Sequence, residues 1–263
     1  GNDIITSNYY GQTLYGNNGD DIFYLQYGSK NAKNETYGGN GNDTFYINSN
    51  YQNCYGEADD DTFYISSGKI GNTVDGGTGN NQITDNGTNT TTINVPGANT
   101  FQVSFNANET KTLTINNIDY TVTNKYNSTR NFDYSISESG RILFKSYGYT
   151  IKGALDKAHN VSLEAVNTIF YGGNLADTII SNQYSNSVYG LGGDDTIYLQ
   201  MHASFADGGD GDDKIYNNHA DNRIITGTGT NIVESNGSGA VIVCNVNDTV
   251  NVIGSWTSVF STT

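Results

Sequence analysis

A nine-residue motif recurs along this chain at a nearly constant spacing, and no other feature constrains the fold as strongly. Segments 38–46 and 208–216 both read Gly-Gly-x-Gly-x-Asp-x-U-x, where U is apolar. Less complete copies surround them, and most successive sixth-position acids are 18 residues apart. These acids are Asp3, Asp21, Asp43, Asp61, Asp177, Asp195 and Asp213, with Asn81 and Asn231 in their place at the ends of two arrays. A fixed period predicts a stack of equivalent coils, each contacting its neighbours.

Weaker nine-residue units lie halfway between these acids, so one full coil contains two units. Their sixth positions are Gln12, Asn34, Gln52, Asn72, Asn186, Ser204 and Asn222. Two residues after each sixth position comes an apolar residue, except at Thr36. Because side chains alternate between the two faces of a strand, we predict one inward-facing core residue per half coil. This column is Ile5, Leu14, Phe23, Thr36, Phe45, Cys54, Phe63, Val74 and Ile83, then Ile179, Val188, Ile197, Ala206, Ile215, Ile224 and Val233.

The composition fits short strands joined by tight turns, because the chain has 32 Gly and one Pro. We predict an all-β fold, with parallel β-roll arrays and an inserted antiparallel β-domain. The expected parts are a first roll over 1–84, an inserted β-strand domain over 85–170, a second roll over 171–235 and the start of a further β segment over 236–263. Residues 28–33 form an insertion that we expect to bulge from a turn.

The inserted domain is predicted from alternating apolar and polar residues between about 85 and 168, where the motif is absent. One antiparallel hairpin is expected to join 112–116 to 119–123, turning at Asn116 and Asn117. A second is expected to join 132–137 to 141–145, turning at 138–140. We expect these strands to cap the open end of the first roll.

A longer internal repeat is also present. The segment from Asp3 resembles the segment from Asp177, and Gly16 to Gln26 resembles Gly190 to Gln200, at an offset of 174 residues. We therefore expect this chain to be part of a longer tandem protein.

The nonapeptides resemble those of the RTX (repeats-in-toxin, hemolysin-type) family over roughly residues 1–84 and 171–233. That resemblance implies that several calcium ions bind in the turns between successive coils. Calcium prefers six to eight oxygen ligands, and each turn offers main-chain carbonyls and an Asp carboxylate. We expect the seven acids to act in neighbouring pairs: Asp3 with Asp21, Asp21 with Asp43, Asp43 with Asp61, Asp177 with Asp195, and Asp195 with Asp213. The implied glycines are Gly16, Gly19, Gly38, Gly39, Gly41, Gly190, Gly193, Gly208, Gly209 and Gly211.

Three turns depart from the glycine pattern, at 56–59, at 174–176 and at Leu191. Calcium sites that draw on these turns are expected to be weak or empty. At the halfway units, the sixth position is mostly Gln or Asn, which supply no charge. We therefore expect neutral amides to stack along that edge of the roll and calcium to bind along the other edge.

Composition and resemblance together predict the functional class. The formal charge of -15 argues against nucleic acid as a partner, and no apolar run is long enough to predict a membrane span. The resemblance implies an extracellular or cell-surface protein, secreted unfolded by type I secretion and folded by external calcium. We expect a structural or adhesive calcium-binding module of a large RTX protein. Its candidate partners besides calcium are a cell-surface glycan and neighbouring modules of the same chain.

Catalysis is not expected, because His159, His202 and His219 lie in no nucleophile or zinc motif. Two other functions stay open. The chain could be the carboxy-terminal repeat region of a secreted hydrolase or polysaccharide-modifying enzyme. It could also bind glycans through an outward column of tyrosines. That column is Tyr15, Tyr24, Tyr37, Tyr46, Tyr55, Tyr64, Tyr189, Tyr198 and Tyr216.

Overall fold

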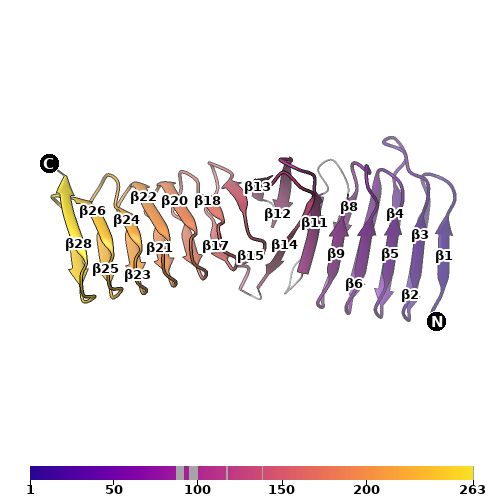
Figure 1. The fold of residues 1–263 in the computed structure, drawn as a ribbon. Helices are drawn as coiled ribbons and strands as arrows, with labels where there is room; N and C mark the ends of the chain where they lie inside the picture. The colour runs from indigo at the N-terminus through magenta and orange to yellow at the C-terminus, as the bar shows by residue number, and fades with distance from the viewer. Residues whose placement is uncertain (87–91, 95–99, 117, 138, 263) are drawn as a thin grey trace. The chain divides into compact units, whose positions relative to one another are not determined.

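The computed structural model describes residues 1–86, 92–94, 100–116, 118–137 and 139–262. Every regular element among them is a β-strand, which confirms the predicted all-β class. The chain divides into two compact units, Gly1–Gly140 and Arg141–Thr263. Within each unit, short strands stand side by side, coil next to coil (Figure 1).

Unit 1 is a roll of two seven-stranded sheets. In the parallel coils the main chain passes from one sheet to the other after every strand, so alternate strands pair with each other. The first sheet contains β1 (Ile4–Ser7), β3 (Ile22–Leu25), β5 (Thr44–Ile47), β7 (Thr62–Ile65), β9 (Gln82–Asp85), β11 (Thr100–Phe105) and β14 (Arg130–Ile136). The second contains β2 (Thr13–Asn18), β4 (Asn34–Asn40), β6 (Gln52–Ala58), β8 (Thr73–Asp75), β10 (Thr92–Asn94), β12 (Thr110–Ile115) and β13 (Ile118–Asn124).

The first coils pair in parallel and in the register set by the motif. Phe23 pairs with Phe45, and Phe45 with Phe63. Like residues therefore stack on like residues, which confirms the predicted parallel β-roll. The insertion at 28–33 protrudes from a turn, where Ser29 and Ala32 form an isolated antiparallel bridge.

Two antiparallel pairs occur among the last strands of unit 1. The predicted hairpin over 112–123 is confirmed, since β12 pairs antiparallel with β13, although Asn117 of its turn lies outside the described residues. β12 also pairs in parallel with β10. β14 pairs antiparallel with β11, which itself pairs in parallel with β9. The antiparallel strands thus extend both sheets. Glu138, in the turn expected for the second hairpin, also lies outside the described residues.

Unit 2 has the same two-sheet arrangement, and all of its described pairs are parallel. One sheet contains β15 (Ile142–Phe144), β17 (Asn160–Leu163), β19 (Thr178–Ser181), β21 (Thr196–Leu199), β23 (Lys214–Asn217), β25 (Ile232–Ser235) and β27 (Thr249–Val252). The other contains β16 (Tyr149–Gly153), β18 (Ile169–Tyr171), β20 (Ser187–Gly192), β22 (Phe205–Asp210), β24 (Arg223–Ile225), β26 (Val241–Asn245) and β28 (Ser258–Thr262).

The core follows the predicted inward column. From Phe23 onward every member of that column is buried, including Thr36, while Ile5 and Leu14 in the first coil are half-buried. One expectation was wrong: β3, β5 and β7 each bury two apolar side chains. The second column is Leu25, Ile47 and Ile65, all fully buried. A four-residue strand places two side chains on its inner face, so two residues per strand reach the core.

Candidate metal centre

Along one edge of each roll, the turns that hold the sixth-position acids form what we call the acid edge. Each acid there is bonded to the preceding coil through one carboxylate oxygen. Asp43 Oδ1 accepts a hydrogen bond from the backbone N–H of Asp21 at 2.8 Å, and Asp61 Oδ1 accepts one from Asp43 at 2.9 Å. Asp195 and Asp213 accept the equivalent bonds from Asp177 and Asp195, both at 2.8 Å. With Asp3 and Asp21 joined at 2.6 Å, all five predicted pairs lie on adjacent coils.

The second oxygen of most of these carboxylates has no partner. Oδ2 is buried and accepts no hydrogen bond in Asp21, Asp43, Asp61, Asp195 and Asp213, whose side chains are at most 1% exposed. A buried acceptor without a donor is costly, and more so when it carries charge. Five positions in the acid edge therefore need a donor or a cation.

Each unpaired oxygen faces a main-chain carbonyl of the next coil. A methyl group placed on Gly38 would collide with both Asp43 Oδ2 and the carbonyl oxygen of Gly56. The same holds at Gly190, between Asp195 Oδ2 and the carbonyl oxygen of Gly208. Gly16, Gly56 and Gly208 form equivalent cradles beside Asp21, Asp61 and Asp213. Two oxygen acceptors thus lie close to the Cα of a glycine, where a larger residue would not fit.

The second and fourth motif positions adopt the left-handed backbone conformation. Gly39 and Gly41 have φ angles of 116° and 115°, which glycine accepts without a steric penalty. The turn keeps this shape where glycine is replaced, at Asn17, Glu57, Asp59 and Leu191, with φ between 72° and 79°. The remaining predicted glycines at these positions, Gly19, Gly193, Gly209 and Gly211, are left-handed too.

Two predicted acids differ from the other five. Asp177 Oδ2 accepts a hydrogen bond from the N–H of Gly173 at 2.9 Å, so it has a donor of its own. That turn contains the departure at 174–176, and Gly173 is not left-handed there. Asp3 is exposed in the first coil. The unpaired oxygens therefore fall on fewer turns than the motif count predicts.

Burial makes the acid edge electrostatically unfavourable when no cation is present. Desolvation raises the pKa of Asp61 and of Asp195 to about 8, and that of Asp43 and of Asp213 to about 6. Neighbouring carboxylates add to the increase in pKa at each of these aspartates. The hydrogen bonds from backbone N–H groups to Oδ1 lower the pKa, but by less than desolvation raises it.

Sequence reasoning missed a second ladder, formed by the fifth motif position. Asp20 Oδ1 accepts from the N–H of Asn42 at 2.9 Å, and Asp60 Oδ1 accepts from Asn80 at 2.8 Å. These bonds run to the following coil, opposite in direction to those of the sixth position. The sequence feature that could have predicted this ladder is the Asp or Asn directly before the sixth-position acid, as in Asp194-Asp195 and Asp212-Asp213. The fifth-position side chains are exposed, so water can solvate them.

The donor set of the cradles fits calcium by chemical type. Each offers a carboxylate oxygen and a main-chain carbonyl oxygen, the ligands that a hard divalent cation prefers. Among the described residues no three His, Cys, Asp or Glu side chains converge on one point. A cation here would therefore be held by fewer than three such side chains, together with main-chain carbonyls.

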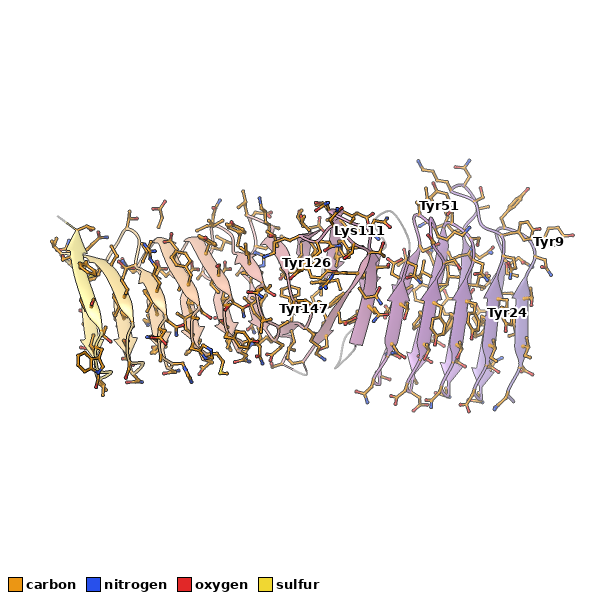
Figure 2. The ribbon with its side chains drawn as sticks, in the orientation of Figure 1. Tyr9, Tyr24, Tyr51, Lys111, Tyr126 and Tyr147 are labelled. Atoms are coloured by element: carbon orange, nitrogen blue, oxygen red, sulfur yellow. The ribbon has the colours of Figure 1, made fainter. Side chains whose placement is uncertain are left out.

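The outward tyrosines stack into ladders. Tyr24, Tyr46 and Tyr64 have ring centroids 5.0 and 5.2 Å apart with nearly parallel planes, and Tyr24 lies over the strands of unit 1 in Figure 2. The same stacking joins Tyr15, Tyr37 and Tyr55. It also joins Tyr198 to Tyr216, and Tyr189 to Tyr171. Tyr171 was not part of the predicted column. Because the ring faces contact each other, the ladders present mainly edges and hydroxyls to solvent.

His202 and His219 lie outside the acid-edge cradles, whereas His159 continues the acid-edge ladder, since its backbone N–H donates to Asp177 Oδ1 at 2.6 Å. His159 is buried and its Nε2 lies 3.0 Å from the carbonyl oxygen of Ala154, while the exposed His202 stacks on Tyr184. His219 is exposed as well, with its ring next to that of His202.

No family model matches this chain, and no curated protein resembles it in sequence. The part of the chain that the structure describes has no helix able to cross a membrane.

Proposed function

We propose that this chain is a calcium-binding structural module of the RTX type, whose acid edges are held together by several Ca²⁺ ions. One observation carries the proposal: five buried Asp Oδ2 atoms lack a donor, and each faces a carbonyl of the next coil. A cation placed between them would satisfy both oxygens and neutralise the carboxylate.

The same arrangement would couple folding to the ion. When both are ionised, successive carboxylates on one edge repel each other, by about 3 kcal/mol for unit charges 5 Å apart at an effective dielectric of 20. Several such pairs rival the total stability of a domain, about 5–15 kcal/mol. Calcium bound to the folded coils reverses this repulsion, so ion binding contributes directly to the free energy of folding.

The proposed setting is extracellular. Cradles with one carboxylate per turn carry little charge, and low-charge sites bind calcium at about 10⁻⁴–10⁻³ M, as extracellular modules do. We propose a secreted or cell-surface protein in which this module is a non-catalytic spacer or adhesive segment. The stacked tyrosines do not favour glycan binding, because sugar rings pack on exposed aromatic faces.

Calcium titration tests the proposal directly. In excess EGTA the chain is expected to lose most of its β-sheet signal in far-UV circular dichroism, and millimolar Ca²⁺ is expected to restore it. Mg²⁺ is the control, since it demands a tighter octahedral shell and should not substitute. An unchanged spectrum in EGTA would refute calcium-coupled folding. An absence of binding heat in calorimetry would refute the sites themselves.

A further inference from the structure

The edge opposite the acid edge uses the same ladder with a different side chain. We call it the amide edge, formed by the turns that contain the halfway sixth positions. Asn34 Oδ1 accepts from the N–H of Gln12 at 2.8 Å, and Asn72 Oδ1 accepts from Gln52 at 2.8 Å. In unit 2, Asn186 Oδ1 accepts from Thr168 at 2.9 Å. These oxygens accept a hydrogen bond from a backbone N–H of the preceding coil, as the aspartate Oδ1 atoms do on the acid edge.

The second polar atom is where the two edges differ. Asn34 Nδ2 donates to the carbonyl oxygens of Tyr9 at 3.2 Å and Tyr27 at 2.6 Å, which belong to successive coils. Gln52 Nε2 donates to the carbonyls of Tyr27 at 2.9 Å and Asn50 at 3.2 Å, again from two coils. At Asn34 and Gln52 an amide NH₂ group thus bridges carbonyls, whereas Asn72 Nδ2 is buried without a partner and the acid edge has an unpaired oxygen.

Glycine packs against similar atoms at both edges, although Gly28 lies one coil before Gln52 and Asn50, whereas Gly38 and Asp43 share a turn. A methyl group on Gly28 would collide with Gln52 Nε2 and the carbonyl oxygen of Asn50. At Gly38 the matching pair is Asp43 Oδ2 and the carbonyl oxygen of Gly56. Both edges therefore contain one polar side-chain atom and one carbonyl beside a glycine, with a donor on one edge and only acceptors on the other.

The acid edge already contains this exchange at its array ends. Asn81 Oδ1 accepts from the N–H of Asp61 at 2.7 Å, and Asn231 Oδ1 accepts from Asp213 at 2.8 Å, so the ladder continues unchanged. Asn231 Nδ2 lies 3.4 Å from the carbonyl oxygen of Thr228 and 3.1 Å from Asp248 Oδ1. Turns on this edge accept an amide in the place of a carboxylate.

We infer that a side-chain amide takes the place of a bound cation in these turns. The ion requirement is then confined to the acid edge. Each Asp there can be exchanged for Asn to give a turn that needs no ion. The identity of the ion as calcium rests on the proposed function. At the amide edge, Asn34 and Gln52 would hold neighbouring coils together without ions, whereas the acid edge would need bound ions.

Asp61→Asn tests the inference, with Asp60→Asn as the matched control. Asp60 is the neighbouring exposed acid, so its exchange removes the same charge without supplying a donor to the cradle. Asp61→Asn is expected to bind one Ca²⁺ fewer per chain by calorimetry. In EGTA it is expected to keep more β-sheet signal in far-UV circular dichroism than wild type, because the exchange removes a buried acceptor that has no donor. Asp60→Asn should keep the wild-type stoichiometry.

The inference is overturned if Asp61→Asn retains the full calcium stoichiometry, or if in EGTA it is no more stable than Asp60→Asn. Asp195→Asn repeats the test in unit 2. The reverse exchange, Asn186→Asp, should lower stability in EGTA and regain it when Ca²⁺ is added; indifference to Ca²⁺ would also contradict the inference. If wild type binds no calcium, the proposed function fails, yet the comparison of the two variants in EGTA still decides the amide exchange.

Discussion

At the scale of single residues, each acid-edge aspartate divides two tasks between two oxygens. Oδ1 of Asp61 fixes the register of the preceding coil through a backbone N–H, while Oδ2 is left against a carbonyl. The motif predicted where these residues stand but not this division. A hydrogen bond that crosses 18 residues depends on the stacking of coils, and so does the burial that removes water from Oδ2.

The raised pKa values predict a proton as a substitute for the cation. In the ion-free coil Asp61 and Asp195, with pKa values of about 8, hold protons that the unfolded chain releases above about pH 4. The stability of the ion-free fold therefore falls as pH rises from about 4 to about 8. In EGTA, acidification from about pH 8 to about pH 5 is expected to restore β-sheet signal in circular dichroism. Light scattering must show that the acidified chain is monodisperse, and a signal that grows with rising pH would contradict the expectation.

At the scale of strands, β3, β5 and β7 are four-residue segments that each bury two side chains and turn the other two outward. In unit 1 the inner phenylalanines Phe23, Phe45 and Phe63 stack at 4.7 and 4.5 Å, directly behind the outer tyrosine ladder. The second inner column escaped prediction because it is not uniformly apolar. Leu25 and Ile47 in unit 1 correspond to positions such as Ser181 and Asn217 in unit 2, which are buried but polar.

Phe45 and Tyr46 allow the inner and outer faces of β5 to be compared. Phe45→Ala leaves a cavity between two stacked rings and is expected to lower the free energy of unfolding by about 3–5 kcal/mol. Tyr46→Ala removes cross-strand contacts from a half-exposed ladder and is expected to cost about 1 kcal/mol or less. Urea denaturation at saturating Ca²⁺ measures both. Equal losses would show that the inner column does not dominate the packing of the roll.

At the scale of the whole chain, the unpaired oxygens are divided between the two units. Asp21, Asp43 and Asp61 lie in unit 1, and Asp195 and Asp213 lie in unit 2. Each unit also has its own parallel coils, so each would carry its own row of ions. The stability of both units should then depend on the calcium concentration.

The calcium dependence of unfolding counts the ions in each unit. For every bound ion, a tenfold rise in free Ca²⁺ above its dissociation constant adds about 1.4 kcal/mol to the free energy of unfolding. Urea denaturation at a series of Ca²⁺ concentrations should give a slope of about three ions for unit 1 and about two for unit 2, in one or two transitions. A slope of zero would contradict ion-linked folding.

The sequence alone determined the period of the coil, the inward column from Phe23 onward, and the edge on which the acids gather. These follow because stacked coils place residues of equal motif position above one another, and alternation along a strand settles which of them face inward. Tertiary structure decided which carboxylate oxygens lack a donor, why Asp177 differs, and how β14 reaches β11. Those outcomes depend on atoms of neighbouring coils, whose carbonyls and N–H groups meet a given side chain only after the main chain has turned back upon itself.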